Sequence, residues 1–169
     1  MKKIILALAF LSYFMFAEEV KELTDEQINT LVKVCESGKD FTNENGTVKY
    51  EEACATLGMI YENIPVLGDL GVKQDLAKAF KFYKKACDGN DYAACSDLGA
   101  MYDNGIGVKK DYKKAVELFD KACDGGIADG CNNLGHMYAN GKGVKMDMTR
   151  AMGYARRACD AGSWMACGN

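Results

Sequence analysis

Eight cysteines are the residues of this 169-residue sequence with the clearest chemical potential. The last six form three pairs with an internal spacing of eight residues, and successive pairs are 36 residues apart. The full set is Cys35, Cys54, Cys87, Cys95, Cys123, Cys131, Cys159 and Cys167. Zinc knuckles use a shorter spacing and redox sites use Cys-x-x-Cys, which is absent here. An even number of regularly spaced cysteines therefore favours structural disulfides.

Histidine and methionine offer a second kind of chemistry. His136 is the one histidine, and Met146, Met148 and Met152 follow it closely in the sequence. Thioether and imidazole ligands suit soft metals such as copper, but no ligand spacing here is diagnostic of a metal site. We therefore expect no metal and no cofactor.

Polar residues in two corresponding segments are the candidates for binding a ligand. Each asparagine amide offers a donor and an acceptor, so neighbouring asparagines can hold an extended peptide backbone. A solvent-exposed helix surface without a ligand explains the same residues, and His136 also fits a variable surface position. The candidate ligand-binding residues are Ser96, Asp97, Asn132, Asn133 and His136.

These residues lie in an internal repeat of 36 residues, which must position them. LGMIY, LGAMY and LGHMY begin at Leu57, Leu98 and Leu134, and NGIGVKKD and NGKGVKMD follow the last two. Apolar residues recur at three- and four-residue steps, the pattern of an amphipathic helix. The expected helices span 24–36, 47–63, 75–88, 91–103, 111–124, 127–139 and 147–161, with a short piece at 163–169.

The ends of these helices also have sequence signals. Asp75, Asp111 and Asp147 each precede an apolar stripe and suit the N-cap position, while Thr24 with Gln27 resembles a capping box. Gly58, Gly99 and Gly135 recur in register inside helices, which indicates close helix packing. No segment shows convincing alternation with a period of two, so we predict no strands.

The pattern LGxMY…GxGVxxD…A…KAC resembles the Sel1-like repeat, a relative of the tetratricopeptide repeat. Its cysteine-rich form resembles the Helicobacter cysteine-rich protein family, over residues 24–169. The resemblance implies an all-α fold, an α/α solenoid of Sel1-like repeats stapled by disulfides, with a concave surface. About 3.5 repeats would fill a single domain over 18–169, with an enlarged first unit.

The repeat register also selects a disulfide pairing. One cysteine of each pair ends a helix and its partner begins the next, so a folded hairpin brings the two together. The expected bonds are Cys35–Cys54, Cys87–Cys95, Cys123–Cys131 and Cys159–Cys167.

Slow β-lactam hydrolysis, as in a β-lactamase or penicillin-binding protein, is implied by the family resemblance alone. A serine β-lactam hydrolase needs a lysine three residues after its nucleophile, and none of the four serines has one. A metal-dependent hydrolase needs several ligands, and disulfide bonding would leave only His136. We identify no catalytic residues.

The N-terminal segment has the form of a secretory signal peptide. A basic Met1-Lys2-Lys3 precedes an uncharged apolar stretch, and Ala17 is a small residue suited to cleavage. We expect 1–17 to be removed and the protein to be periplasmic or secreted, although an uncleaved anchor fits the same pattern. No other segment suits a membrane span, and the formal charge of −3 argues against binding nucleic acid.

Three functions remain open at this level. The first is a binding or scaffold module for a peptide, a peptidoglycan-derived ligand, a β-lactam or an envelope protein. The second is the β-lactam hydrolase implied by resemblance, and the third is an assembly factor for exported redox proteins. The pairing above uses every cysteine for structure, which favours binding over catalysis.

Overall fold

The computed structural model describes residues 23–43, 46–63 and 70–163. The chain divides into two compact units, Met1–Gly89 and Asn90–Asn169. The expected signal peptide and most of the expected helix at 163–169 lie outside the described residues. Within the described ranges, no helix has both the length and the apolar character that crossing a membrane requires.

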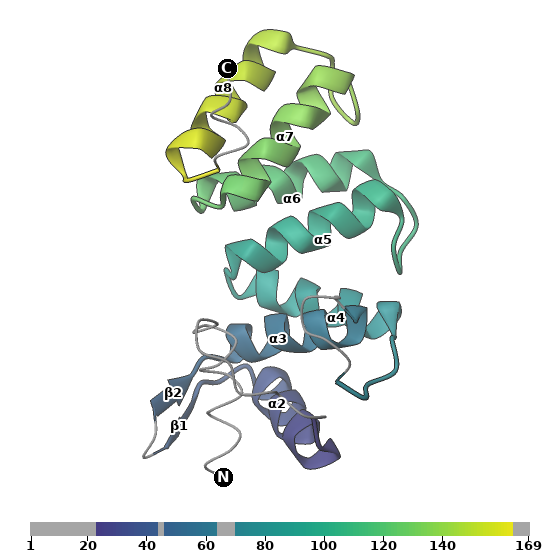
Figure 1. The fold of residues 1–169 in the computed structure, drawn as a ribbon, viewed down its shortest axis with the longest axis vertical. Coiled ribbons are helices and arrows are strands. Elements are labelled where there is room, and N and C mark those ends of the chain that lie inside the picture. The colour runs from purple at the N-terminus through teal and green to yellow at the C-terminus, as the bar shows by residue number, and fades with distance from the viewer. Residues whose placement is uncertain (1–22, 44–45, 64–69, 164–169) are drawn as a thin grey trace. The chain divides into compact units, whose positions relative to one another are not determined.

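Seven helices account for most of the described chain (Figure 1). Apart from the start of α3, their ends lie within one residue of the predicted ends, and the all-α fold class is confirmed. The helices are α2 (Asp25–Ser37), α3 (Tyr50–Glu62), α4 (Leu76–Asp88), α5 (Tyr92–Asn104), α6 (Tyr112–Asp124), α7 (Ala128–Asn140) and α8 (Met148–Asp160).

The prediction that the chain contains no strands was wrong between α2 and α3. Here β1 (Phe41–Asn43) pairs antiparallel with β2 (Gly46–Val48), and the Thr42 and Thr47 hydroxyls lie 3.0 Å apart. Three residues per strand are too few to show an alternating pattern. The pairing also explains why α3 begins at Tyr50 rather than at residue 47.

Side chains cap the helix starts as the sequence predicts. Thr24 and Gln27 form a reciprocal capping box on α2. The Asp75, Asp111 and Asp147 carboxylates accept hydrogen bonds from backbone N–H groups in the first turns of α4, α6 and α8. Each such cap stabilises a helix by about 1 kcal/mol.

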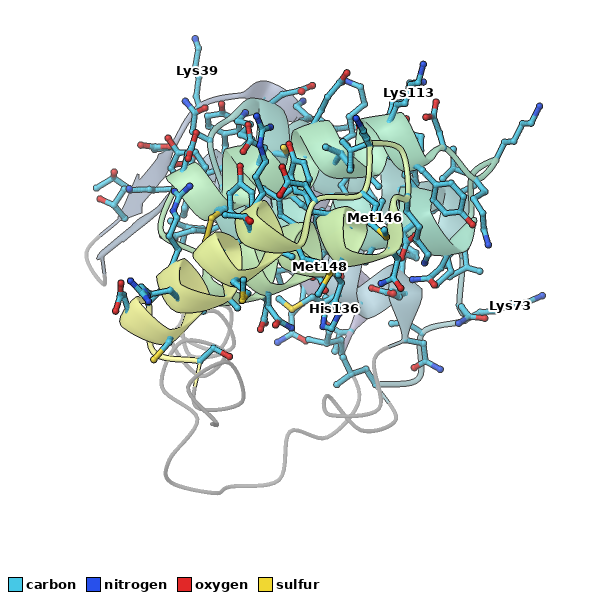
Figure 2. All side chains as sticks on the ribbon, turned by 90° about the horizontal axis from the view of Figure 1, so that it is seen from above. Lys39, Lys73, Lys113, His136, Met146 and Met148 are labelled. Atoms are coloured by element: carbon cyan, nitrogen blue, oxygen red, sulfur yellow. A yellow bond between two sulfur atoms is a disulfide. The ribbon has the colours of Figure 1, made fainter. Side chains whose placement is uncertain are left out.

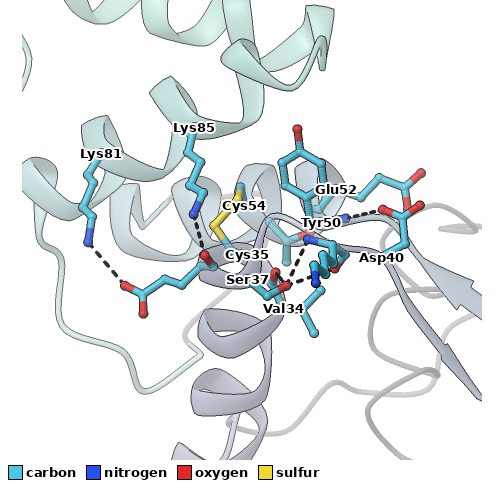
Figure 3. The surroundings of a disulfide bond; sticks show 12 residues. Val34, Cys35, Ser37, Asp40, Tyr50, Glu52, Cys54, Lys81 and Lys85 are labelled. Atoms are coloured by element: carbon cyan, nitrogen blue, oxygen red, sulfur yellow. Dashed lines mark hydrogen bonds and ion pairs between the residues drawn. A yellow bond between two sulfur atoms is a disulfide. The ribbon is translucent and has the colours of Figure 1, made fainter.

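In the first unit, α3 packs against both α2 and α4. A Cβ on Gly58 of α3 would lie 2.5 Å from the Tyr83 ring of α4, so the two helices approach too closely for any other residue there. The Tyr83 hydroxyl donates to the Glu62 carboxylate at 2.8 Å. The Cys35–Cys54 disulfide joins α2 to α3, and Lys85 of α4 donates to the Glu36 carbonyl at 3.0 Å beside it (Figure 3).

In the second unit, α6 packs against α5 and α7, and α7 packs against α8. The Cys123–Cys131 disulfide joins the end of α6 to the start of α7. A Cβ on Gly99 would lie 2.7 Å from the buried Phe119 ring, which repeats the Gly58 arrangement. The core consists of Ala115, Phe119, Cys123, Cys131, Leu134, Met137 and Ala158.

The remaining described cysteines are also oxidised. Cys87, Cys95 and Cys159 are disulfide-bonded, and no described cysteine is free. The pairings Cys87–Cys95 and Cys159–Cys167 stay predictions, and Cys167 lies outside the described residues. Buried disulfides take up thiols that would otherwise bind metals or attack substrates.

Candidate binding surface

The outer face of α7 carries three of the predicted ligand-binding residues. Asn132 and Asn133 are half-buried and His136 is exposed. His136 lies four residues after Asn132 and three residues after Asn133, so the three side chains share one side of the helix. The opposite side packs into the core through Leu134 and Met137. Figure 2 shows the His136 side chain projecting from α7.

The other two predicted residues lie on α5, which contacts α7 within the same unit. Asp97 is exposed. Ser96 is only 6 % exposed, so its hydroxyl is not available at the surface. Ser96 occupies the repeat position of Asn132, which is half-buried. The structure thus leaves Asn132, Asn133 and His136 as a candidate surface, here called the α7 face, while Asp97 is exposed on α5.

The α7 face is suited to hydrogen bonding. Asn132 and Asn133 each present an amide donor and an amide acceptor. The Asn140 side chain donates to the His136 carbonyl at 2.8 Å, which fixes the end of the helix beside the imidazole. Among the described residues, no three His, Cys, Asp or Glu side chains are grouped closely enough to hold a metal.

A second feature, not found from the sequence, recurs where the tyrosine that ends LGMIY, LGAMY or LGHMY meets the next helix. A cation lies over the tyrosine ring in all three copies, with ring-centre distances of 4.8, 5.2 and 5.5 Å. Each cation also lies within 4.0 Å of the aspartate that caps its helix. The pairs are Lys78–Tyr61, Lys114–Tyr102 and Arg150–Tyr138. The signal was present in the sequence as a basic residue three positions after each capping aspartate.

The third copy differs because its cation is an arginine. One guanidinium nitrogen of Arg150 donates to the Tyr138 hydroxyl at 3.2 Å, and Nε lies 3.5 Å from Asp147. The hydrogen bond to Tyr138 is the main cause that raises the pKa of Arg150 above its ordinary value. Tyr138 stacks on Tyr154 of α8 with ring centres 5.5 Å apart. Burial, and then the nearby Asp120 carboxylate, raise the pKa of the Tyr154 phenol.

The repeat units of the structure coincide with a known sequence family. The family model of the Sel1 repeat matches residues 51–91, 93–127 and 128–163, which together cover more than half of the chain. The chain belongs to the Sel1-repeat family. The family thus confirms the α/α solenoid class of the fold. Each matched segment corresponds to one helix pair: α3 with α4, α5 with α6, and α7 with α8. No curated protein matches the chain.

Solved structures of Sel1-repeat and cysteine-rich proteins are similar to this Sel1-repeat chain. Cysteine-rich protein B of Helicobacter pylori is 31% identical with a TM-score of 0.59, and the match covers 83% of this chain and 95% of that one. A protective antigen of uropathogenic Escherichia coli strains is 30% identical with a TM-score of 0.70 over 84% of this chain. A Sel1 repeat protein of Oxalobacter formigenes, 21% identical with a TM-score of 0.72 over 85% of this chain, shows the fold alone. This chain spans 27% and 37% of the Escherichia and Oxalobacter chains.

Proposed function

We propose that this Sel1-repeat protein is a binding module that holds a peptide or protein partner on the α7 face. The observation that carries the proposal is the pairing of a rigid, disulfide-fixed helix with an outer face of hydrogen-bonding side chains. Asn132, Asn133 and His136 are presented by a helix whose first turn is bonded to α6 through Cys131. Side chains held by a rigid scaffold lose little entropy on binding, so they suit recognition.

The compartment we propose is the periplasm or the extracellular space. Described disulfides and the likeness to a Helicobacter cysteine-rich protein support an extracytoplasmic role. Disulfides form and persist in oxidising compartments, while the cytosol keeps thiols reduced. The partner is therefore an exported or envelope protein, and the signal-like segment 1–17 supports the same location.

Site-specific photocrosslinking in the native envelope tests the proposal. A photoreactive amino acid at position 136 of the full chain should give one discrete crosslinked partner. Position 113 is the matched control, because Lys113 is an exposed helix residue on α6, outside the α7 face. The same crosslinked species at both positions, or none at position 136, would refute the assignment of the α7 face.

A further inference from the structure

A depression of about 420 Å³ lies where the turn after α7 leads into α8. It is lined by Tyr138, Val144, Lys145, Met146, Asp147 and Arg150. Two cations and one carboxylate give the lining a net positive charge, in a chain whose formal net charge is −3. The remaining lining is a tyrosine ring and two apolar side chains, so the depression offers positive charge beside an apolar wall.

The one carboxylate of the lining is already engaged. Asp147 accepts a hydrogen bond from the Arg150 backbone N–H at 3.0 Å, and its second oxygen lies 3.5 Å from Arg150 Nε. Lys145 is exposed and forms no hydrogen bond or ion pair with the described residues. The Arg150 side chain is 64% exposed, and Tyr138 and Asp147 together hold only part of its guanidinium. Both cations can therefore still bind an anion.

The corresponding turn of the preceding repeat shows what is particular to this copy. There Lys114 takes the place of Arg150, and Lys110, which lies over the Tyr112 ring at 5.7 Å, takes the place of Met146. Guanidinium presents planar, paired N–H donors that match a carboxylate, whereas ammonium acts as a point charge. Met146 is 64% exposed and replaces a cation by an adaptable apolar side chain.

We propose that this depression binds a carboxylate that carries an apolar substituent, as at the C-terminus of a peptide ending in an apolar residue. Arg150 and Lys145 pair with the carboxylate, while Val144, Met146 and the Tyr138 ring contact the apolar substituent. The arrangement needs both halves of the ligand, because an exposed ion pair alone contributes little affinity. The site shares no residue with the α7 face, so the inference is independent of the proposed function.

Three probes test the need for a carboxylate and the need for a peptide. They are an N-acetylated Ala-Ala-Leu peptide with a free carboxylate, the same peptide as a C-terminal amide, and 4-methylpentanoate. Binding to the full chain is followed by NMR of methionine methyl groups. Met146 lines the depression, whereas Met152 is equally exposed at 64% and does not. Figure 2 shows Met146 beside the turn that leads into α8. We expect the free acid to shift the Met146 methyl signal selectively and the amide to bind about tenfold more weakly or not at all.

Variants then test which basic side chains bind the carboxylate. Arg150→Gln and Lys145→Gln should each weaken binding of the free-acid peptide, by about tenfold for the arginine. Lys114→Gln is the matched control and should leave binding unchanged. Arg150→Lys keeps the positive charge and introduces the lysine found in the other two copies. It should still lower the affinity for the free-acid peptide several-fold, because the paired N–H donors of the guanidinium are lost.

Three results would overturn the proposal. Equal affinities for the free acid and the amide would show that the carboxylate takes no part in binding. The absence of any Met146 shift with either peptide would show that the ligand does not bind in the depression. Equal losses for Arg150→Gln and Lys114→Gln would show a diffuse charge effect. Binding of 4-methylpentanoate as tight as that of the peptide supports the chemistry and assigns it to a small carboxylate. Crosslinking at position 136 reports on the α7 face separately from all of these outcomes.

Discussion

Gly99 and Gly153 allow the helix packing to be tested with one matched pair of substitutions. Both lie inside helices, α5 and α8, and replacing glycine by alanine in an open helix position stabilises it by about 1 kcal/mol. A Cβ on Gly153 would meet nothing within 4 Å. A Cβ on Gly99 would lie 2.7 Å from the ring of Phe119, which is only 2% exposed and has no room to move.

The expected effects therefore differ between the two positions. Gly153→Ala should raise the free energy of unfolding by about 1 kcal/mol. Gly99→Ala gains the same helix preference, but overpacking in a core costs about 1–3 kcal/mol, so its net effect should be neutral to destabilising. Urea denaturation followed by circular dichroism measures both values. The Phe119→Leu background should reduce the penalty of Gly99→Ala, because the two positions are coupled through the contact.

Close packing of Gly99 against Phe119 would be refuted if Gly99→Ala stabilised the protein as much as Gly153→Ala does. It would also be refuted if the Gly99→Ala effect were the same with phenylalanine and with leucine at position 119. Either result would show that the helices separate freely enough to admit a methyl group.

Two further perturbations follow from the disulfides and from the stacked tyrosine. The Cys123–Cys131 and Cys35–Cys54 bonds close loops of 8 and 19 residues, so paired alanine substitutions should cost about 2.5 and 3.2 kcal/mol in the chain-entropy model. Chemical denaturation measures both losses, and a larger loss for the shorter loop would contradict the entropic origin. The raised pKa of Tyr154 means that the folded state favours the neutral phenol, so the wild-type protein should lose stability relative to Tyr154→Phe as pH rises past about 10. Denaturation curves of the two proteins that stay parallel from pH 8 to 10.5 would refute this.

Much of the fold could be predicted because local signals agree with tertiary packing. Asp75, Asp111 and Asp147 precede apolar stripes and do cap their helices. The repeated glycine at positions 58 and 99 could be interpreted correctly because packing is the same in each copy. Repetition supplies several independent examples of one rule within a single chain.

The features that were missed depend on what surrounds a residue. The β1–β2 hairpin lies in an insertion with no counterpart in later repeats, so its three-residue strands could not be checked against a second copy. Ser96 and Asn132 share a repeat position, but Ser96 is buried and Asn132 is only half-buried. The depression at the α7–α8 turn depends on Arg150 folding back over Tyr138, a contact across 12 residues that no helical period indicates.

The most direct test of the account is the affinity of the crosslinked partner for two double variants. Asn133→Ala with His136→Ala alters the α7 face, while Lys113→Ala with Glu117→Ala alters the exposed face of α6. Loss of several interface hydrogen bonds should weaken binding by about tenfold or more in the first variant and leave the second unchanged. Equal affinity of the partner for both variants and the wild-type protein would contradict the assignment of the α7 face as the binding surface.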